Sequence, residues 1–247
     1  MKKTTKMKYL ATIGLSALVL LASCKSEPKN QANDAGPSST AETVESENQK
    51  KEQSILEKIA SANGIENWPR VEELKFTFNV DREGNPHFER SWIWKPKTNE
   101  ISAMTAEDTL IYNRNEMDST VQKTNANFIN DKFWLLAPIN FKWDEQSIVT
   151  EHTMETEAPI SSETMQKLTV TYDDQGGYTP GDAYDVYFGD DYIVREWVYR
   201  KGNQAEPSLI TTWEDYTEKG GLKIAEMHQN EEGDFKLYFT DVEVTTE

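Results

Sequence analysis

The chain has 247 residues, of which 43 are acidic and 26 are basic, so its formal net charge is -17 at pH 7. A surface this acidic repels nucleic acids and anionic lipid headgroups, which excludes a nucleic-acid partner and a purely electrostatic membrane anchor. The single Cys excludes an internal disulfide, and about 200 residues remain for one β-rich domain once a leader and a tether are set aside.

The first 23 residues have the organisation of a bacterial export signal. A lysine-rich start precedes the apolar run 9–21, which is too short to span a bilayer as a helix. The letters L-A-S-C that end at Cys24 resemble the lipobox of bacterial lipoproteins. That resemblance implies cleavage before Cys24 and acylation of this residue, which then attaches the protein to a membrane. An ordinary secretory signal with a chance Cys is the alternative.

The composition changes twice along the mature chain. Residues 25–44 contain no aromatic residue and are rich in Ser, Asn, Pro, Lys and Glu, so they cannot bury enough apolar surface to fold. We therefore expect a lipoprotein signal peptide at 1–23, a flexible lipid-anchored tether at 24–45 and a single β domain at 46–247.

An amphipathic helix is predicted at 46–62. Ser46 and the Gln three residues later, Gln49, form a capping-box pattern, and apolar residues follow at helical spacing. Asn63 and Gly64 supply a C-terminal stop. The apolar stripe is narrow, which favours packing on a sheet over binding a partner.

Alternating apolar and polar residues, separated by turns rich in Gly, Pro and Asp, predict about ten or eleven strands. The densest part of this antiparallel meander is 167–202. The predicted strands are 71–80, 87–95, 99–104, 109–113, 147–153, 168–172, 184–188, 192–199, 208–216, 222–229 and 235–244.

One segment, 121–138, departs from the alternation. Its aromatic and aliphatic residues are crowded together, Asn130 and Asp131 can cap a short helix, and Pro138 can close it. We expect this insert to lie across the mouth or interior of the sheet. Extended structure is expected to resume at 139–143, and an acidic loop is expected at 155–164.

This order of parts resembles the outer-membrane lipoprotein carrier and sorting superfamily, LolA/LolB-like, and especially lipoproteins of that type found in Bacteroidetes. The resemblance rests on WEDYTEKGGLKIAE at 213–226, FTDVEV at 239–244, FWLLAP at 133–138 and GYTPGDAYD at 177–185. It implies a mainly β (α+β) fold, a single strongly curved antiparallel sheet forming an unclosed β-barrel, with a few helices packed on or into its concave face. It also implies that acyl chains bind in the cavity.

The aromatic residues of the strands and the insert can either fill a core or line such a cavity, and the sequence leaves both readings open. The family's lid-locking Arg has two candidates in predicted strands, Arg90 and Arg195. The candidate cavity residues are Phe76, Phe78, Trp92, Trp94, Phe133, Trp134, Trp197, Tyr199 and Trp213.

We expect no catalytic residue, no metal and no cofactor. His87, His152 and His228 have no second His or Cys at ligand spacing, and no nucleotide-binding or nucleophile motif is present. The acidic turns between 173 and 191 do not match a calcium-binding loop and are expected to be solvated.

The prediction is therefore a non-enzymatic envelope lipoprotein that binds an acyl chain or other apolar ligand, anchored through acylated Cys24 at the outer membrane, on the periplasmic face rather than the surface. A protein- or glycan-binding module with a filled core is the alternative. A carboxylate-dependent hydrolase is the third possibility.

Overall fold

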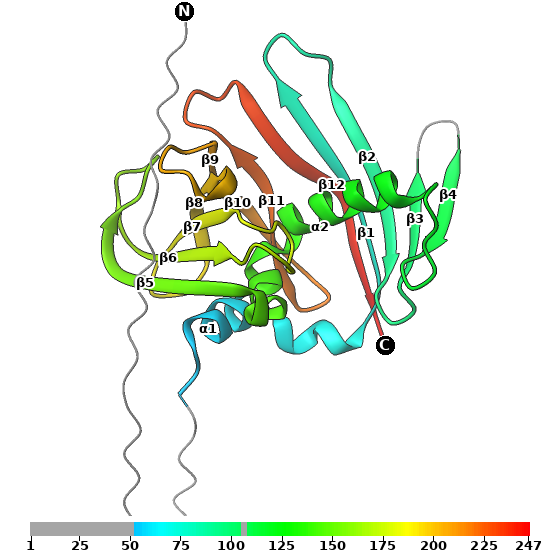
Figure 1. Cartoon of the computed structure of the whole chain (residues 1–247), viewed down its shortest axis with the longest axis horizontal. Helices are drawn as coiled ribbons and strands as arrows, with labels where there is room; N and C mark the ends of the chain where they lie inside the picture. The colour runs from blue at the N-terminus through cyan, green and yellow to red at the C-terminus, as the bar shows by residue number, and fades with distance from the viewer. Residues whose placement is uncertain (1–51, 105–107) are drawn as a thin grey trace, which may run out of the picture. The chain divides into compact units, whose positions relative to one another are not determined.

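The computed structural model describes residues 52–104 and 108–247. These residues form twelve strands in two antiparallel sheets, together with the helices α1 (Ile55–Ala62) and α2 (Gln122–Trp143) (Figure 1). Short 3-10 turns lie at Ile65–Arg70, Glu145–Ser147 and Lys201–Asn203. The predicted signal peptide, Cys24 and the tether lie outside the described residues.

The larger sheet has seven strands in the order β10-β11-β12-β1-β2-β3-β4, and the smaller has five in the order β5-β6-β7-β8-β9. The strands of the larger sheet are β1 (Val71–Arg82), β2 (Phe88–Lys95), β3 (Glu100–Met104), β4 (Thr109–Asn113), β10 (Glu214–Lys219), β11 (Leu222–Gln229) and β12 (Phe235–Thr246). The strands of the smaller sheet are β5 (Ile148–Glu157), β6 (Thr164–Tyr172), β7 (Ala183–Phe188), β8 (Val194–Arg200) and β9 (Leu209–Thr212).

The predicted fold class, mainly β with an unclosed antiparallel arrangement, is confirmed, but the strands form two sheets where a single curved sheet was expected. Among the described residues, each edge strand pairs on one side only, so neither sheet closes on itself. The strand count is twelve because the run predicted as one strand at 208–216 is two strands in different sheets. Trp213 stands between them, and its backbone N–H donates to the carbonyl of Arg195 at 2.7 Å. The left-handed φ of Asp215 (53°) follows at the start of β10.

Helix α1 begins later than predicted. Ser54 has an extended backbone (φ -64°, ψ 161°) and accepts a hydrogen bond from the N–H of Glu57, whose carboxylate accepts from the N–H of Ser54. This capping box makes Ile55 the first helical residue, so the helix predicted at 46–62 is wrong in its start. The Ser46–Gln49 pattern lies outside the described residues. The predicted stop holds, since Asn63 is the C-cap.

Helix α2 is longer than the predicted insert, and the prediction of extended structure at 139–143 is wrong. The backbone breaks at Leu136 (φ -126°, ψ 18°), and the helix then continues to Trp143. Pro138 has no N–H to donate to the preceding turn, so a break just before it removes the clash that a proline makes inside a helix. Pro138 thereby falls in the first turn of a second helical segment, where proline is tolerated.

The acidic loop predicted at 155–164 is shorter than expected. Strand β5 continues to Glu157 through an irregularity between Thr153 and Thr156, and β6 begins at Thr164. Strand β5 is an edge strand whose side chains are mostly exposed, so backbone pairing with β6 needs no apolar alternation. This explains why sequence alternation missed its second half.

Helix α2 contributes to two separate apolar cores. Phe128, Leu135 and Ile139 pack with β1, β2 and β12, whereas Phe133, Ala137 and Phe141 pack with β6, β7, β8 and α1. Figure 1 shows α2 running from the side of β2 and β3 towards α1 and β5. The helix therefore occupies the space between the inner faces of both sheets.

Candidate functional site

The first half of α2 buries a single stripe of residues. Val121, Asn125, Phe128 and Asp131 are buried and are spaced three or four positions apart, while Gln122, Lys123 and Ala126 are exposed. A helix with this period presents one face to its support. That face lies on the larger sheet, where Phe128 meets Trp92 and Trp94 edge-on at 5.5 Å between ring centroids.

A buried carboxylate attaches this half of the helix to β2. Asp131 has no exposed surface and accepts two hydrogen bonds from Arg90, at 2.7 and 2.5 Å. It also accepts from the indole N–H of Trp92 at 2.9 Å and from the side-chain amide of Asn130 at 3.0 Å. Burial raises the pKa of Asp131, and the hydrogen bonds from Arg90 act against that rise. We call this ion pair the latch.

A groove lies beside the latch, between the first half of α2 and strands β2 to β4. Its volume is about 220 Å³. The residues of this α2 groove include Arg90 and Trp92 of β2, Ala103 and Met104 of β3, Leu110 of β4, and Thr124 and Asn127 of α2. Ser91 and the acidic Asp108 complete the walls. Most of the exposed wall surface is apolar, and the charge of Arg90 is already neutralised by Asp131.

A second, smaller cavity of about 110 Å³ lies where α2 meets β7 and β8. Its walls are Phe133, Trp134, Tyr178, Tyr184, Trp197 and Tyr199, with Asn130 and Thr179. We call it the aromatic pocket. The rings of Phe133 and Tyr178 stack in parallel at 3.7 Å, which fixes the turn carrying Tyr178 against the helix.

Polar side chains connect the aromatic pocket with the latch. The Tyr178 hydroxyl donates to the Asn130 side-chain oxygen at 3.1 Å, and the Asn130 amide donates to Asp131 at 3.0 Å. Asp131 is in turn held by Arg90. One hydrogen-bonded series thus runs from the turn before β7, through α2, to β2, and it ties the first half of the helix to both sheets.

The solved structures that are similar to this chain include two from bacteria. One is a LolA superfamily protein from Nitrosomonas europaea, with a TM-score of 0.47 and 10% identity, covering 76% of this chain and 93% of that chain. The other is a DUF1329 family protein from Desulfovibrio piger, with a TM-score of 0.43 and 8% identity, covering 77% and 91%. The LolA superfamily predicted from the sequence is among these structural matches. No protein-family model matches the sequence, and no curated protein matches it.

The predicted cavity residues fall into three places. Trp92 lines the α2 groove, and Phe133, Trp134, Trp197 and Tyr199 line the aromatic pocket. The other four are buried in the two cores, away from both cavities: Phe76, Phe78, Trp94 and Trp213. The nine candidates therefore do not line one common cavity in the described residues.

Sequence reasoning missed several residues of these sites. Asp131 was predicted to cap a helix, but it lies inside α2 and pairs with a residue 41 positions away. Tyr178 and Tyr184 lie on either side of the turn at 179–182, and only their position next to Phe133 brings them into the site. Burial raises the pKa of Tyr178 and of Tyr184, so both phenols stay neutral.

The three histidines lie apart from one another. His87 is exposed and hydrogen-bonds Asp81 at 2.8 Å, which raises its pKa, and His152 contacts Gln166. His228 is fully buried, and burial lowers its pKa to about 3. Across 52–104 and 108–247, no group of three or more His, Cys, Asp or Glu side chains is arranged to hold a metal ion. Within the same ranges, no helix is long and apolar enough to cross a membrane.

Proposed function

We propose that this chain is a non-enzymatic envelope lipoprotein that binds an acyl chain or a similar apolar ligand in the α2 groove. The observation that carries this proposal is an apolar groove whose one basic wall residue, Arg90, is neutralised by a partner on the helix. Arg90 therefore brings no uncompensated positive charge into the groove. Each Å² of ligand surface removed from water contributes about 25 cal/mol, with no covalent step.

The size of the groove implies that α2 moves when ligand binds. Ligand pockets measure about 300–1,000 Å³, whereas the groove holds about 220 Å³. The break at Leu136 provides a natural pivot for the first half of the helix. The latch opposes that movement, so its rupture would accompany ligand entry.

Arg90 is the better match for the lid-locking Arg implied by the family resemblance. It bonds a buried carboxylate on the helix that covers the sheet. Arg195 instead pairs with Asp191 of a neighbouring turn, and both of those side chains are substantially exposed. We therefore assign the locking role to Arg90 and Asp131.

Fatty-acid binding to the full chain in a non-ionic detergent tests the proposal, with a fluorescent fatty acid as the probe. Leu110 lines the groove, whereas Ile111 alternates to the opposite face of β4 and is 61% exposed. We expect Leu110→Glu to weaken binding at least tenfold and Ile111→Glu to leave it unchanged. No binding by the wild type, or equal effects of the two variants, contradicts the proposal.

Membrane attachment through acylated Cys24 is the second part of the proposal, and it rests on the sequence alone. We expect Cys24→Ala to leave an uncut precursor or to move the protein from the membrane fraction to the soluble fraction. Electrophoretic mobility and fractionation measure this. A variant that migrates and fractionates like the wild type would remove the anchor from the proposal.

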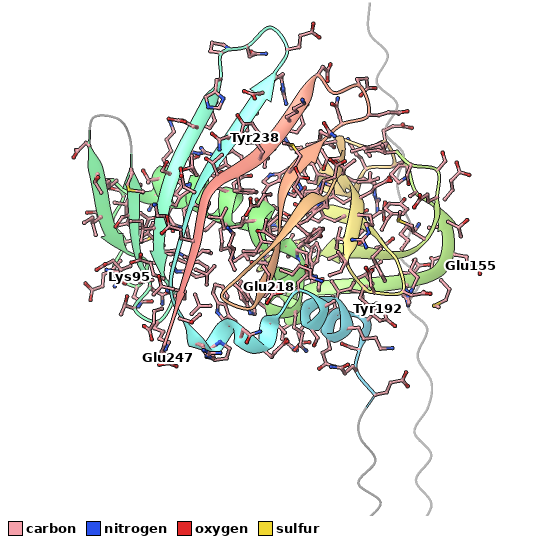
Figure 2. The ribbon with its side chains drawn as sticks, turned by 180° about the vertical axis from the view of Figure 1, so that it is seen from behind. Lys95, Glu155, Tyr192, Glu218, Tyr238 and Glu247 are labelled. Atoms are coloured by element: carbon pink, nitrogen blue, oxygen red, sulfur yellow. The ribbon has the colours of Figure 1, made fainter. Side chains whose placement is uncertain are left out.

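A protein-binding module is the second candidate, and an exposed edge strand favours it. Val149 and Met154 of β5 are 65% and 63% exposed, and among the described residues β5 pairs only with β6. Figure 2 shows Glu155 of this strand at the margin of the β5–β9 sheet, with its side chain directed outward. An open edge can accept a strand from a partner. A folded wild type that binds no fatty acid would favour this candidate.

A further inference from the structure

The aromatic pocket has the walls of a cation site. Six of its eight wall residues carry aromatic rings, and none is Lys or Arg. Ring faces carry negative electrostatic potential and attract cations that lie over them. The volume of about 110 Å³ is small for a drug-sized molecule, whose pockets start at about 300 Å³, and it suits one compact headgroup.

The three tyrosine hydroxyls of the pocket walls are already hydrogen-bonded, whereas the indole N–H of Trp197 is buried without a partner. The Tyr178 hydroxyl donates to Asn130, the Tyr184 hydroxyl bonds Thr179 at 3.1 Å, and the Tyr199 hydroxyl donates to Asp182 at 2.9 Å. A sugar or an anion needs several free donors, and a primary ammonium needs free acceptors to replace its hydration. A ligand that makes no hydrogen bonds avoids this requirement.

A carboxylate lies next to the pocket. Asp182 accepts hydrogen bonds from the Tyr199 hydroxyl and from the backbone N–H of Gly202. Burial raises the pKa of Tyr199 to about 12, and the negative charge of Asp182 adds to that rise. Lys132 of the same stretch of α2 lies over the rings of Trp94 and Trp143 instead, away from the pocket walls.

We infer that the aromatic pocket binds a quaternary ammonium group. This cation is compact, cannot donate hydrogen bonds and is held by ring faces. The site goes beyond the proposed apolar-ligand function, because it shares no wall residue with the α2 groove. A free methylated ammonium compound and the headgroup of a choline lipid share this chemistry.

Calorimetric titration of the full chain with choline tests the inference, in a detergent that lacks choline. The matched probe is 3,3-dimethyl-1-butanol, which has the shape of choline without its charge. We expect choline to bind at least tenfold more tightly than the alcohol. No choline binding, or equal binding of the two probes, overturns the inference. Because the comparison uses the wild type, it does not depend on how a variant folds.

Variants of Tyr199 locate the site. We expect Tyr199→Leu to weaken choline binding about fivefold or more, Tyr199→Phe to stay within about twofold, and Tyr238→Leu on β12 to have no effect, since Tyr238 lies outside the pocket walls. Choline binding that is unaffected by Tyr199→Leu in a folded protein contradicts the assignment to this pocket.

A short-chain phosphatidylcholine below its micellar concentration separates the two sources of the cation. Binding at least tenfold tighter than choline identifies a lipid headgroup, and equal binding identifies a free compound. The Leu110→Glu variant keeps this test independent of the acyl-chain proposal. It is expected to leave choline binding unchanged whether or not the α2 groove accepts fatty acid.

Discussion

The two halves of α2 are held by different forces. After the break at Leu136, every residue from 137 to 141 is buried, and Phe141 packs with Phe133 and with α1 in the core under the smaller sheet. Before the break, Phe133 and Leu135 also belong to the two cores, whereas 122–131 bury one stripe and contact β2 through Phe128 and through the latch. The second half lies wholly in the core, whereas the first half, which we call the cover, is partly exposed and depends in part on an ion pair.

This difference affects how each half can move. Apolar burial is non-directional, and it is lost gradually as contacts separate. A buried ion pair contributes little net stability compared with apolar packing, but breaking it on one side is strongly destabilising. Loss of one latch partner is therefore expected to cost more than loss of one apolar contact. A ligand that separates the cover from β2 breaks the hydrogen bonds between Arg90 and Asp131. Its binding must compensate for the loss of those bonds on both side chains.

The largest effect is expected in the second half of α2. Phe141→Ala removes a ring that is 1% exposed and leaves a cavity, so we expect the free energy of unfolding to fall by about 4 kcal/mol. Lys123→Ala, at an exposed position of the first half, is the control and should change it by less than about 0.5 kcal/mol. Urea denaturation measures both. A loss under about 1 kcal/mol for Phe141→Ala would mean that this half is not a core element.

The next effect is expected at the latch. Arg90→Met leaves Asp131 buried without a counter-charge, so we expect the free energy of unfolding to fall by about 3 kcal/mol. This value is at the lower end of the range for broken buried ion pairs, because Arg90 is partly exposed. Arg195→Met removes an exposed ion pair and should cost less than about 1 kcal/mol.

Amide hydrogen exchange distinguishes a released cover from general destabilisation. In Arg90→Met we expect faster exchange at 122–135 and little change at 137–143, because only the first half depends on the latch. The double variant Arg90→Met, Asp131→Leu should recover part of the lost stability. Equal acceleration in both halves would contradict the division of α2.

Most of the strands were predictable because apolar and polar residues alternate along them. Alternation located β4 and β11 to the residue, and it correctly placed β1, β2 and β7 within two residues at each end. It could not divide the run at 208–216, because buried Trp213 follows buried Thr211 at strand spacing, with the half-buried Thr212 between them. Only its backbone bond to Arg195 and the turn at Asp215 show where the chain changes sheets.

The site was less predictable because its chemistry depends on contacts distant in sequence. An Asp before an apolar run is the ordinary signature of an N-cap, so Asp131 was interpreted as one. Its true partner is set by how α2 lies on β2. The aromatic residues were identified as a class, but the sequence cannot divide them between a filled core and two separate cavities, because that division depends on the packing of α2.

The smallest effect concerns His228, whose ring lies under Trp134 near the end of the cover, at 5.4 Å between centroids. Burial lowers its pKa to about 3 from an ordinary value of 6.5. The stability that the fold gains by keeping this ring neutral is therefore fully present above pH 6.5. This stability is lost as the pH falls towards 3, because His228 binds a proton in the unfolded chain but not in the folded chain. We expect about 2 kcal/mol of lost stability at pH 5.

The free energy of unfolding is measured at several pH values for the wild type and for His228→Leu. The difference between the two proteins isolates the effect of His228, because all other groups titrate in both. The difference in the free energy of unfolding between the two proteins should be constant above pH 7 and shift by about 1.4 kcal/mol per pH unit between 6 and 4, in favour of the variant. Parallel curves for wild type and His228→Leu would show that the ring under Trp134 accepts a proton in the folded state. The junction between cover and core would then be accessible to water.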